Sequence, residues 1–139
     1  MRLLRVLVAA TAMSASPLSG SVWAQDAPAP GKGDPATGEK VFVKCRACHQ
    51  IGETAKNAIG PELNGVIGRH SGSVPDYNYS EANRNSGLIW DEPTFREYIR
   101  NPKAKVPGTK MIIAGLTREK DIDDFVAYLE QFRSDGKKK

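Results

Sequence analysis

The sequence predicts an all-α domain with long loops, and two observations support this fold class. Three segments combine helix-capping residues with apolar residues spaced along one helix face, whereas no segment alternates like a half-buried strand. Between the first two segments, residues 51–88 are rich in Gly, Asn, Ser and Pro and lack a regular apolar pattern. A loop of this length in a compact domain is usually functional or wraps around something.

The two ends of the sequence are expected to lie outside the domain. Residues 1–24 have the pattern of a cleaved signal peptide, because Arg2 and Arg5 precede a short apolar run and small residues lead to Ala24. That run is too short to span a membrane, so no transmembrane segment is expected after cleavage. The remaining predicted parts are a flexible linker at 25–33, the folded domain at 34–133 and a basic disordered tail at 134–139.

Length and charge narrow the class of protein before any motif is considered. The 139 residues suffice for one domain and not comfortably for two, and we expect a monomer. Removal of the leader, which has two arginines and no acidic residue, lowers the formal net charge from +4 to +2. Nucleic-acid binding usually needs a stronger basic excess gathered on one face, so no nucleic acid is expected among the partners.

The first expected helix runs from Pro35 to about Lys44. Asp34 suits the N-cap position, where its side chain can accept a backbone hydrogen bond. Proline is favoured at the first helical position, because its missing N–H would have no partner there. Val41 and Phe42 supply the apolar contacts of this helix.

Two more helices are expected after the long loop. The first is capped by Asp91 and stops at Asn101-Pro102, and its inner face carries Phe95, Tyr98 and Ile99. The other starts at Thr117 or Asp121, and its apolar positions at i, i+3, i+4 and i+7 are Ile122, Phe125, Val126 and Leu129. Three such helices leave too little apolar surface in the middle of the chain for an ordinary core. A large apolar cofactor would complete it.

The segment Cys45-Arg46-Ala47-Cys48-His49 carries the strongest chemical signal. Its Cys-x-x-Cys-His spacing is that of covalent c-type haem attachment, in which two thiols add to two vinyl groups and the adjacent imidazole reaches the iron. A thioredoxin-like motif would need a βαβ context that the sequence does not show. A structural zinc site would need paired ligands, which the two cysteines, His49 and His70 do not form. We therefore predict one haem c, bound through Cys45 and Cys48, with His49 as an iron ligand.

Two residues compete for the second axial position of the iron. After cleavage the chain retains one methionine, Met111, and one histidine besides His49, which is His70. Met111 ends the rigid turn 107–111, which suits a side chain aimed at a fixed target. His70 lies in a polar loop, where a solvated surface histidine is the more common role. The sequence therefore favours Met111.

These residues lead to a known family, because the chain resembles class I cytochromes c of the mitochondrial and related bacterial kind. The similarity extends from Gly38 to Leu129 and includes, besides the haem motif, the segments 60–69, 79–90, 101–102 and 107–111. It implies the cytochrome c fold, with three main helices and long loops wrapped around a covalently bound haem. The chain departs from the family at Ile113, where Phe is frequent, and the residues after Leu129 have no clear counterpart.

The resemblance also implies roles for individual residues. Pro61 would accept a hydrogen bond from the His49 imidazole through its carbonyl group and orient that ligand. The residues implied to bind the haem propionates are Arg69, Tyr79 and Trp90. Those implied to form a polar network beside Met111 are Asn83, Tyr98 and Thr109. The first and last helices would dock through Gly38, Phe42 and Tyr128.

The predicted function is electron transfer rather than catalysis. With both axial positions filled, the iron offers no open site for oxygen or peroxide, and one electron would cross at an exposed haem edge. We expect a periplasmic carrier that serves a bc-type complex, a terminal oxidase, a photosynthetic reaction centre or a periplasmic dehydrogenase. The basic residues expected to steer these encounters are Lys44, Lys103, Lys105 and Lys110. The alternatives are a c-type haem peroxidase or sensor with a displaceable methionine, and a non-haem thiol oxidoreductase.

Overall fold

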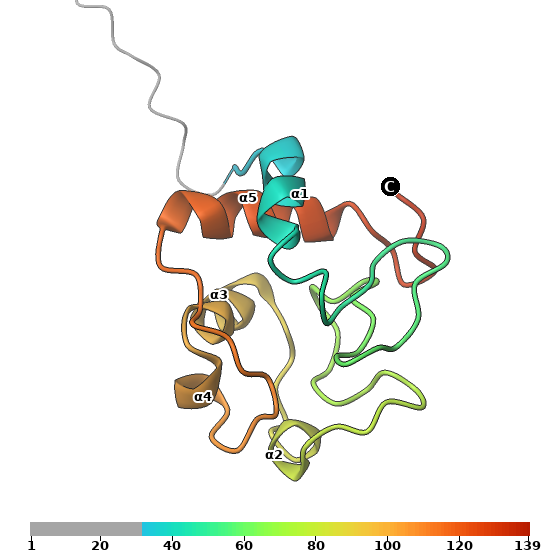
Figure 1. Cartoon of the computed structure of the whole chain (residues 1–139), viewed down its shortest axis with the longest axis vertical. Helices are drawn as coiled ribbons and strands as arrows, with labels where there is room; N and C mark the ends of the chain where they lie inside the picture. The colour runs from blue at the N-terminus through green and yellow to red at the C-terminus, as the bar shows by residue number, and fades with distance from the viewer. Residues whose placement is uncertain (1–31) are drawn as a thin grey trace, which may run out of the picture.

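The computed structural model describes residues 32–139, which form five α-helices joined by loops (Figure 1). The helices are α1 (Pro35–Phe42), α2 (Glu81–Arg84), α3 (Glu92–Arg100), α4 (Pro102–Lys105) and α5 (Glu119–Glu130). Within the described residues there are two isolated β-bridges and no strand, which confirms the all-α prediction. The predicted signal peptide, and the linker as far as residue 31, lie outside the described residues.

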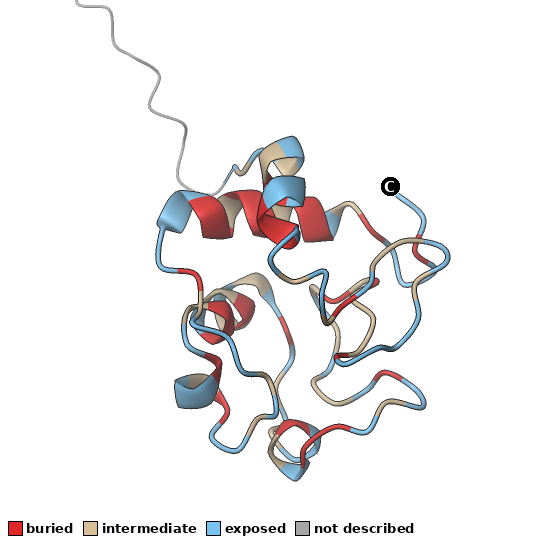
Figure 2. Cartoon of the chain, in the orientation of Figure 1, coloured by how far each residue is buried: buried red, intermediate tan, exposed pale blue. Residues whose placement is uncertain are grey.

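The first and last helices of the domain cross and pack tightly against each other (Figure 1). Gly38 makes this possible, because a Cβ at that position would overlap the carbonyl of Asp124 and lie 2.7 Å from Cβ of Tyr128. The ring of Phe42 lies 5.5 Å from that of Tyr128, centroid to centroid. The predicted docking of the two helices is therefore confirmed. In Figure 2 the buried stretch of α5 coincides with this crossing.

Helix α3 forms the second wall of the core and matches its prediction. The Asp91 carboxylate accepts a hydrogen bond of 2.9 Å from the backbone N–H of Thr94, and the helix stops before Pro102. Its buried residues are Phe95, Tyr98 and Ile99. Arg96 joins α3 to α5 through an ion pair of 2.6 Å with Asp123. The buried face of α3 therefore lines one side of the central cavity of the domain.

Two predicted helix ends are wrong. Helix α1 stops at Phe42 instead of about Lys44, because residues 43–48 continue as hydrogen-bonded turns rather than as regular helix. Helix α5 begins at Glu119, so neither Thr117 nor Asp121 caps it. The Asp121 carboxylate instead pairs with Arg118 at 2.6 Å and lies inside the first turn.

Two short helices were not predicted from the sequence. Helices α2 and α4 have four residues each, which is too short for an apolar periodicity to appear. Both depend on side-chain caps: the Ser80 hydroxyl accepts from the N–H of Asn83, and the side-chain Oδ1 of Asn101 accepts from the N–H of Ala104. Ser80 and Asn101, polar residues of the kind that predicted an irregular loop, thus act as helix caps.

The predicted disordered tail at 134–139 is also wrong. The segment folds back in an antiparallel bridge between Phe132 and Lys138, and Gly136 is buried. Its basic composition favoured a solvated tail, but backbone hydrogen bonds and the packing of Phe132 on Tyr128 hold it in place. Among the described residues, no helix combines the length and apolar character needed to cross a membrane.

Candidate cofactor site

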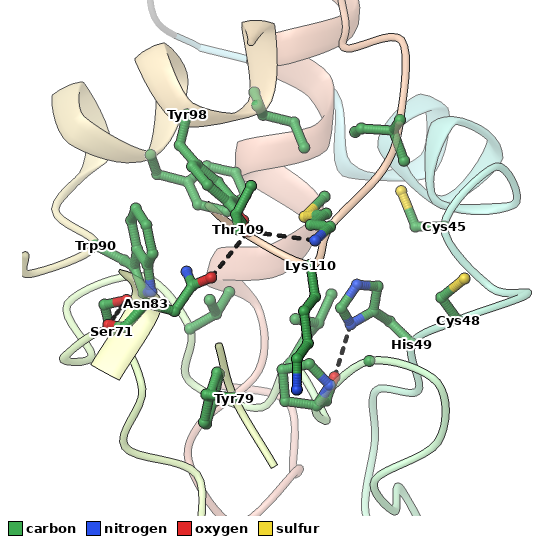
Figure 3. A pocket seen from close by; sticks show the side chains of 18 of the residues that line it. Cys45, Cys48, His49, Ser71, Tyr79, Asn83, Trp90, Tyr98, Thr109 and Lys110 are labelled. Atoms are coloured by element: carbon green, nitrogen blue, oxygen red, sulfur yellow. Dashed lines mark hydrogen bonds between the residues drawn. The ribbon is translucent and has the colours of Figure 1, made fainter. Parts of the chain in front are cut away.

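The described residues enclose a cavity of about 490 Å³ with a mostly apolar lining. Every residue that the sequence predicted for the site lines it: Cys45, Cys48, His49, Pro61, Arg69, Tyr79, Asn83, Trp90, Tyr98, Thr109 and Met111. In the view of Figure 3, the two cysteines and His49 occupy one side of the pocket, and Asn83, Trp90 and Tyr98 the other. Residues from distant parts of the chain therefore meet at one cavity.

The two cysteines follow α1 in a pair of tight turns. The N–H groups of Cys48 and His49 both donate to the carbonyl of Cys45, at 3.0 and 2.9 Å, so one turn carries all three side chains to the cavity. Burial raises the pKa of the Cys45 thiol to about 11, and the neighbouring Cys48 adds to the rise. A thiol–disulfide enzyme needs a thiolate at neutral pH, so this pKa argues against the thiol oxidoreductase alternative.

The His49 imidazole is buried and held in one orientation. Its Nδ1 donates to the carbonyl oxygen of Pro61 at 2.7 Å, the contact that the family resemblance implied. Burial lowers the pKa of His49, and the Pro61 carbonyl opposes that shift without cancelling it. Gly60 lies flat against the ring, where a Cβ would come within 2.6 Å of Nδ1. The imidazole is therefore neutral and directs its other nitrogen, Nε2, away from Pro61, as an iron ligand requires.

Of the two candidate second ligands, only one reaches the cavity. Met111 lines the cavity and is partly buried, and its N–H donates to the Thr109 hydroxyl at 3.2 Å. His70 is exposed and forms a β-bridge with Ile89 outside the cavity lining. The geometry therefore agrees with the preference for Met111 over His70.

A polar network approaches the cavity beside Met111. The Thr109 hydroxyl donates to Oδ1 of Asn83 at 2.8 Å and lies 3.2 Å from the hydroxyl of Tyr98. Oδ1 of Asn83 also accepts from the hydroxyl of Ser80 at 2.9 Å. The structure thus joins the three residues that the resemblance grouped, and it adds Ser80. Ser80 was not predicted, because the sequence does not distinguish a serine that also bonds to this network from one that only caps a helix.

Arg69 lines the cavity and also forms hydrogen bonds with protein groups. Its guanidinium donates to Oε1 of Glu62 at 2.9 Å, to the Asn64 carbonyl at 2.8 Å and to the Glu62 carbonyl at 2.9 Å. Guanidinium carries five N–H donors, so these bonds leave donors for a further acceptor. Sequence reasoning missed Glu62, because nothing in its spacing from Arg69 marks the pair.

The two remaining predicted residues are aromatic side chains with a polar tip. The ring of Trp90 packs 4.6 Å from that of Tyr98, centroid to centroid. Burial raises the pKa of Tyr79, so the phenol keeps its proton and remains a hydrogen-bond donor at neutral pH. Tyr77, which also lines the cavity and packs edge-on against Tyr79, was not predicted.

The lining fits a covalently attached haem. Protein interiors contain few voids larger than a water molecule, so a cavity of this size in so small a domain needs a large occupant. Two thiols and a neutral imidazole at one side would anchor a flat apolar ring. The Met111 thioether adds a soft ligand of the kind that haem iron accepts. The donors of Arg69, Tyr79 and Trp90 suit the acidic groups of such a ring.

Comparisons with known proteins agree with this fit. The family model described as "Cytochrome c" matches residues 35–133. Cytochrome c-554 of Methylosinus trichosporium is 64% identical over 107 residues, which cover 77% of this chain and 81% of that protein. Cytochrome c2 of Blastochloris viridis is 58% identical over 106 residues, covering 76% and 84%. The structure of cytochrome c2 from Rhodospirillum centenum superposes with a TM-score of 0.70 at 41% identity, covering 73% of this chain and 99% of that one.

Proposed function

Because the chain belongs to the cytochrome c family, we propose that it carries single electrons through the periplasm between membrane redox complexes. Family membership makes the chain an electron carrier with one covalently bound haem c, attached at the Cys45 and Cys48 spacing. The observation that supports the finer proposal is a single cavity lined by both cysteines, His49 and Met111.

His49 and Met111 are the proposed axial ligands. When bound, the haem would supply a one-electron Fe(III)/Fe(II) couple, and a thioether ligand from Met111 would favour Fe(II). Pro61 orients the imidazole and keeps its Nδ1 proton in place. Thr109 holds the main chain of Met111 and ties it to Asn83. The chain's own part is to fix two ligands and exclude water.

The protein is proposed to be an electron carrier rather than an enzyme. Two protein ligands leave no open position at which oxygen or peroxide could react. The buried His49 and the hydrogen-bonded turn around Met111 support a site that stays closed. The competing hypothesis is a peroxidase or sensor, in which Met111 would be readily displaced.

The proposed docking face surrounds the mouth of the cavity. Lys44 and Lys110 line the cavity and are exposed, as are the apolar side chains of Ile59, Ile112 and Ile113. Positive charges around an apolar mouth favour fast, short-lived encounters with acidic partner faces. Lys103 and Lys105 lie on α4 outside the cavity lining, and Lys105 pairs with Glu97 at 2.5 Å. The steering face proposed here therefore contains Lys44 and Lys110, which is fewer basic residues than the sequence predicted.

The periplasmic location rests on the signal-peptide pattern of residues 1–24. The proposed partners are a bc-type complex, a terminal oxidase, a photosynthetic reaction centre or a periplasmic dehydrogenase. The partner is identified by mixing the holoprotein with each purified complex and following electron transfer. We expect the rate with the true partner to fall steeply with added salt, and to fall further for Lys44→Ala or Lys110→Ala than for Lys103→Ala. A rate that does not change with salt would contradict electrostatic steering by this face.

The ligand proposal is tested by the spectrum of protein matured in a periplasm. The oxidised holoprotein should show a sulfur-to-iron charge-transfer band at neutral pH, and added cyanide should leave that band unchanged over minutes. Rapid loss of the band in cyanide would favour the peroxidase or sensor hypothesis. Absence of the band from the untreated protein would contradict Met111 ligation altogether.

A further inference from the structure

Residues 131–139, here called the hook, form a small hairpin after α5. The N–H of Arg133 donates to the carbonyl of Lys137 at 2.9 Å, and the N–H of Lys139 donates to that of Gln131 at 2.8 Å. Phe132 anchors the hook, because its ring lies 5.3 Å from that of Tyr128 in the α1–α5 packing. The hook is therefore fixed at one end to the packed pair of α1 and α5.

A second set of contacts begins at the haem motif. The carbonyl of Cys48 accepts from the N–H of Gly60 at 2.8 Å, and the carbonyl of Gln50 accepts from the N–H of Leu63 at 2.9 Å. The amide side chain of Asn64 then binds both main-chain groups of Gly52, at 2.8 and 3.0 Å. These three rungs, here called the ladder, join residues 48–52 to residues 60–64. Pro61, the hydrogen-bond acceptor of His49, lies within it.

The hook packs against the end of the ladder that is farthest from His49. Gly136 is buried against Gly52, where a Cβ would overlap the Gly52 carbonyl and lie 2.7 Å from the N–H nitrogen of Glu53. Ser134 lies at Gly65, where a Cβ would come within 3.0 Å of the Ser134 nitrogen. Figure 1 shows the end of the chain beside this green loop. The hook thus covers the rung made by Asn64.

We propose that the hook is a positioning element for His49, because it closes the ladder that holds the Pro61 carbonyl against the imidazole. The inference rests on the proposed role of His49 as an iron ligand. Segments with few buried contacts and exposed hydrogen bonds open locally at low free energy, so a contact that buries the last rung makes opening of the ladder less favourable. If the ladder opens, the Pro61 carbonyl moves away from Nδ1 of His49. The imidazole then donates its Nε2 electron pair to the iron less strongly, so Fe(III) is stabilised less and the reduction potential rises.

The test uses the holoprotein with two hook variants and one matched control. Gly136→Ala puts a Cβ into the Gly52 contact at a φ of +78°, and a chain stopped after Arg133 removes the contact without adding atoms. Gly87→Ala imposes a similar backbone strain, at a φ of +66°, in open space. Hydrogen exchange is measured at the amides of Gly60 and Leu63, at the His49 Nδ1 proton and at the α3 amide of Phe95. The reduction potential of each variant is measured alongside.

Both hook variants should exchange about tenfold faster at Gly60, Leu63 and the His49 ring, with an unchanged rate at Phe95 and a higher potential. Gly87→Ala should match the parent. Parent-like ladder rates, or equal acceleration at Phe95, would overturn the positioning role. If the parent itself lacked the charge-transfer band, the proposal that Met111 binds the iron would fail. The exchange rates of the Gly60 and Leu63 amides would still show whether the hook stabilises the ladder.

Discussion

At the scale of single residues, Thr109 links the proposed ligand Met111 to the polar network of the site. Its hydroxyl contacts Asn83, Tyr98 and the N–H of Met111. Thr109→Val keeps the shape of the side chain and removes all three contacts, leaving partly buried polar groups without a partner. We expect a loss of about 1–3 kcal/mol in the free energy of unfolding, measured by denaturant titration of the holoprotein. The exposed Thr54→Val is the control, and equal losses for both would show that the network adds nothing.

Met111 is the residue on which the redox proposal depends. Met111→Ala should keep the haem attached, abolish the charge-transfer band, lower the reduction potential and open the iron to added ligands. Spectroscopy and potentiometry of the purified variant measure these changes. Ile112→Ala changes a highly exposed neighbour and should leave the band intact. Survival of the band in Met111→Ala would assign the second ligand elsewhere.

At the scale of elements, the crossing of α1 and α5 is set by the absence of a side chain at Gly38. In an exposed helix, glycine to alanine would stabilise by roughly 0.5–1 kcal/mol. At Gly38 the new Cβ meets Asp124 and Tyr128, so we expect destabilisation of about 1–3 kcal/mol instead. Thermal unfolding of Gly38→Ala beside the exposed Lys40→Ala measures the difference. A stabilised Gly38→Ala would mean that the helices can separate at no cost.

The Asp91 cap at the start of α3 should make the stability of the protein depend on pH. The N–H of Thr94 donates to the Asp91 carboxylate and lowers the pKa of that side chain below its ordinary 3.8. The charged cap therefore stabilises fully above about pH 4, and its contribution is lost as the pH falls through the lowered value. Asp91→Ala should be less stable than the parent at pH 7, and the gap should narrow toward pH 3.

Denaturation midpoints of both proteins at pH 7, 5 and 3 test this prediction. Glu130→Ala, which removes an exposed carboxylate at the far end of α5, is the control and should show a smaller gap at pH 7. A gap for Asp91→Ala that stays constant down to pH 3 would contradict the cap.

At the scale of the whole molecule, the sequence identified what was local and missed what was tertiary. Cys45, Cys48 and His49 lie within five consecutive residues, and the α3 cap at Asp91 is a short-range pattern, so both could be predicted. The contact of Gly136 with Gly52 joins distant segments, and the pairing of Glu62 with Arg69 depends on the irregular path of one loop, so neither has a sequence pattern. Roles that the resemblance implied, such as the Pro61 carbonyl, needed the family as well as the residues.

The cavity also makes a prediction for the whole fold. A chain with Cys45→Ala and Cys48→Ala cannot attach the haem covalently, and when it is prepared free of haem the cavity of about 490 Å³ lacks its occupant. Because large voids remove packing contacts throughout a small core, we expect cooperative thermal unfolding to disappear. Circular dichroism followed with temperature measures this loss, and Met111→Ala holoprotein should still unfold cooperatively. A sharp transition in the double variant would show that the polypeptide folds without the haem.

The packing of α1 on α5 also bears on the order of events during biogenesis. The two partners, Pro35–Phe42 and Glu119–Glu130, stand at opposite ends of the domain, so their contact closes a very long loop. A chain that emerges from its N-terminal end cannot make this contact until its last helix has appeared. Until then the α1–α5 contact cannot enclose the turn that carries Cys45 and Cys48, so both thiols stay accessible while the chain is incomplete, and closure of the domain follows at the end.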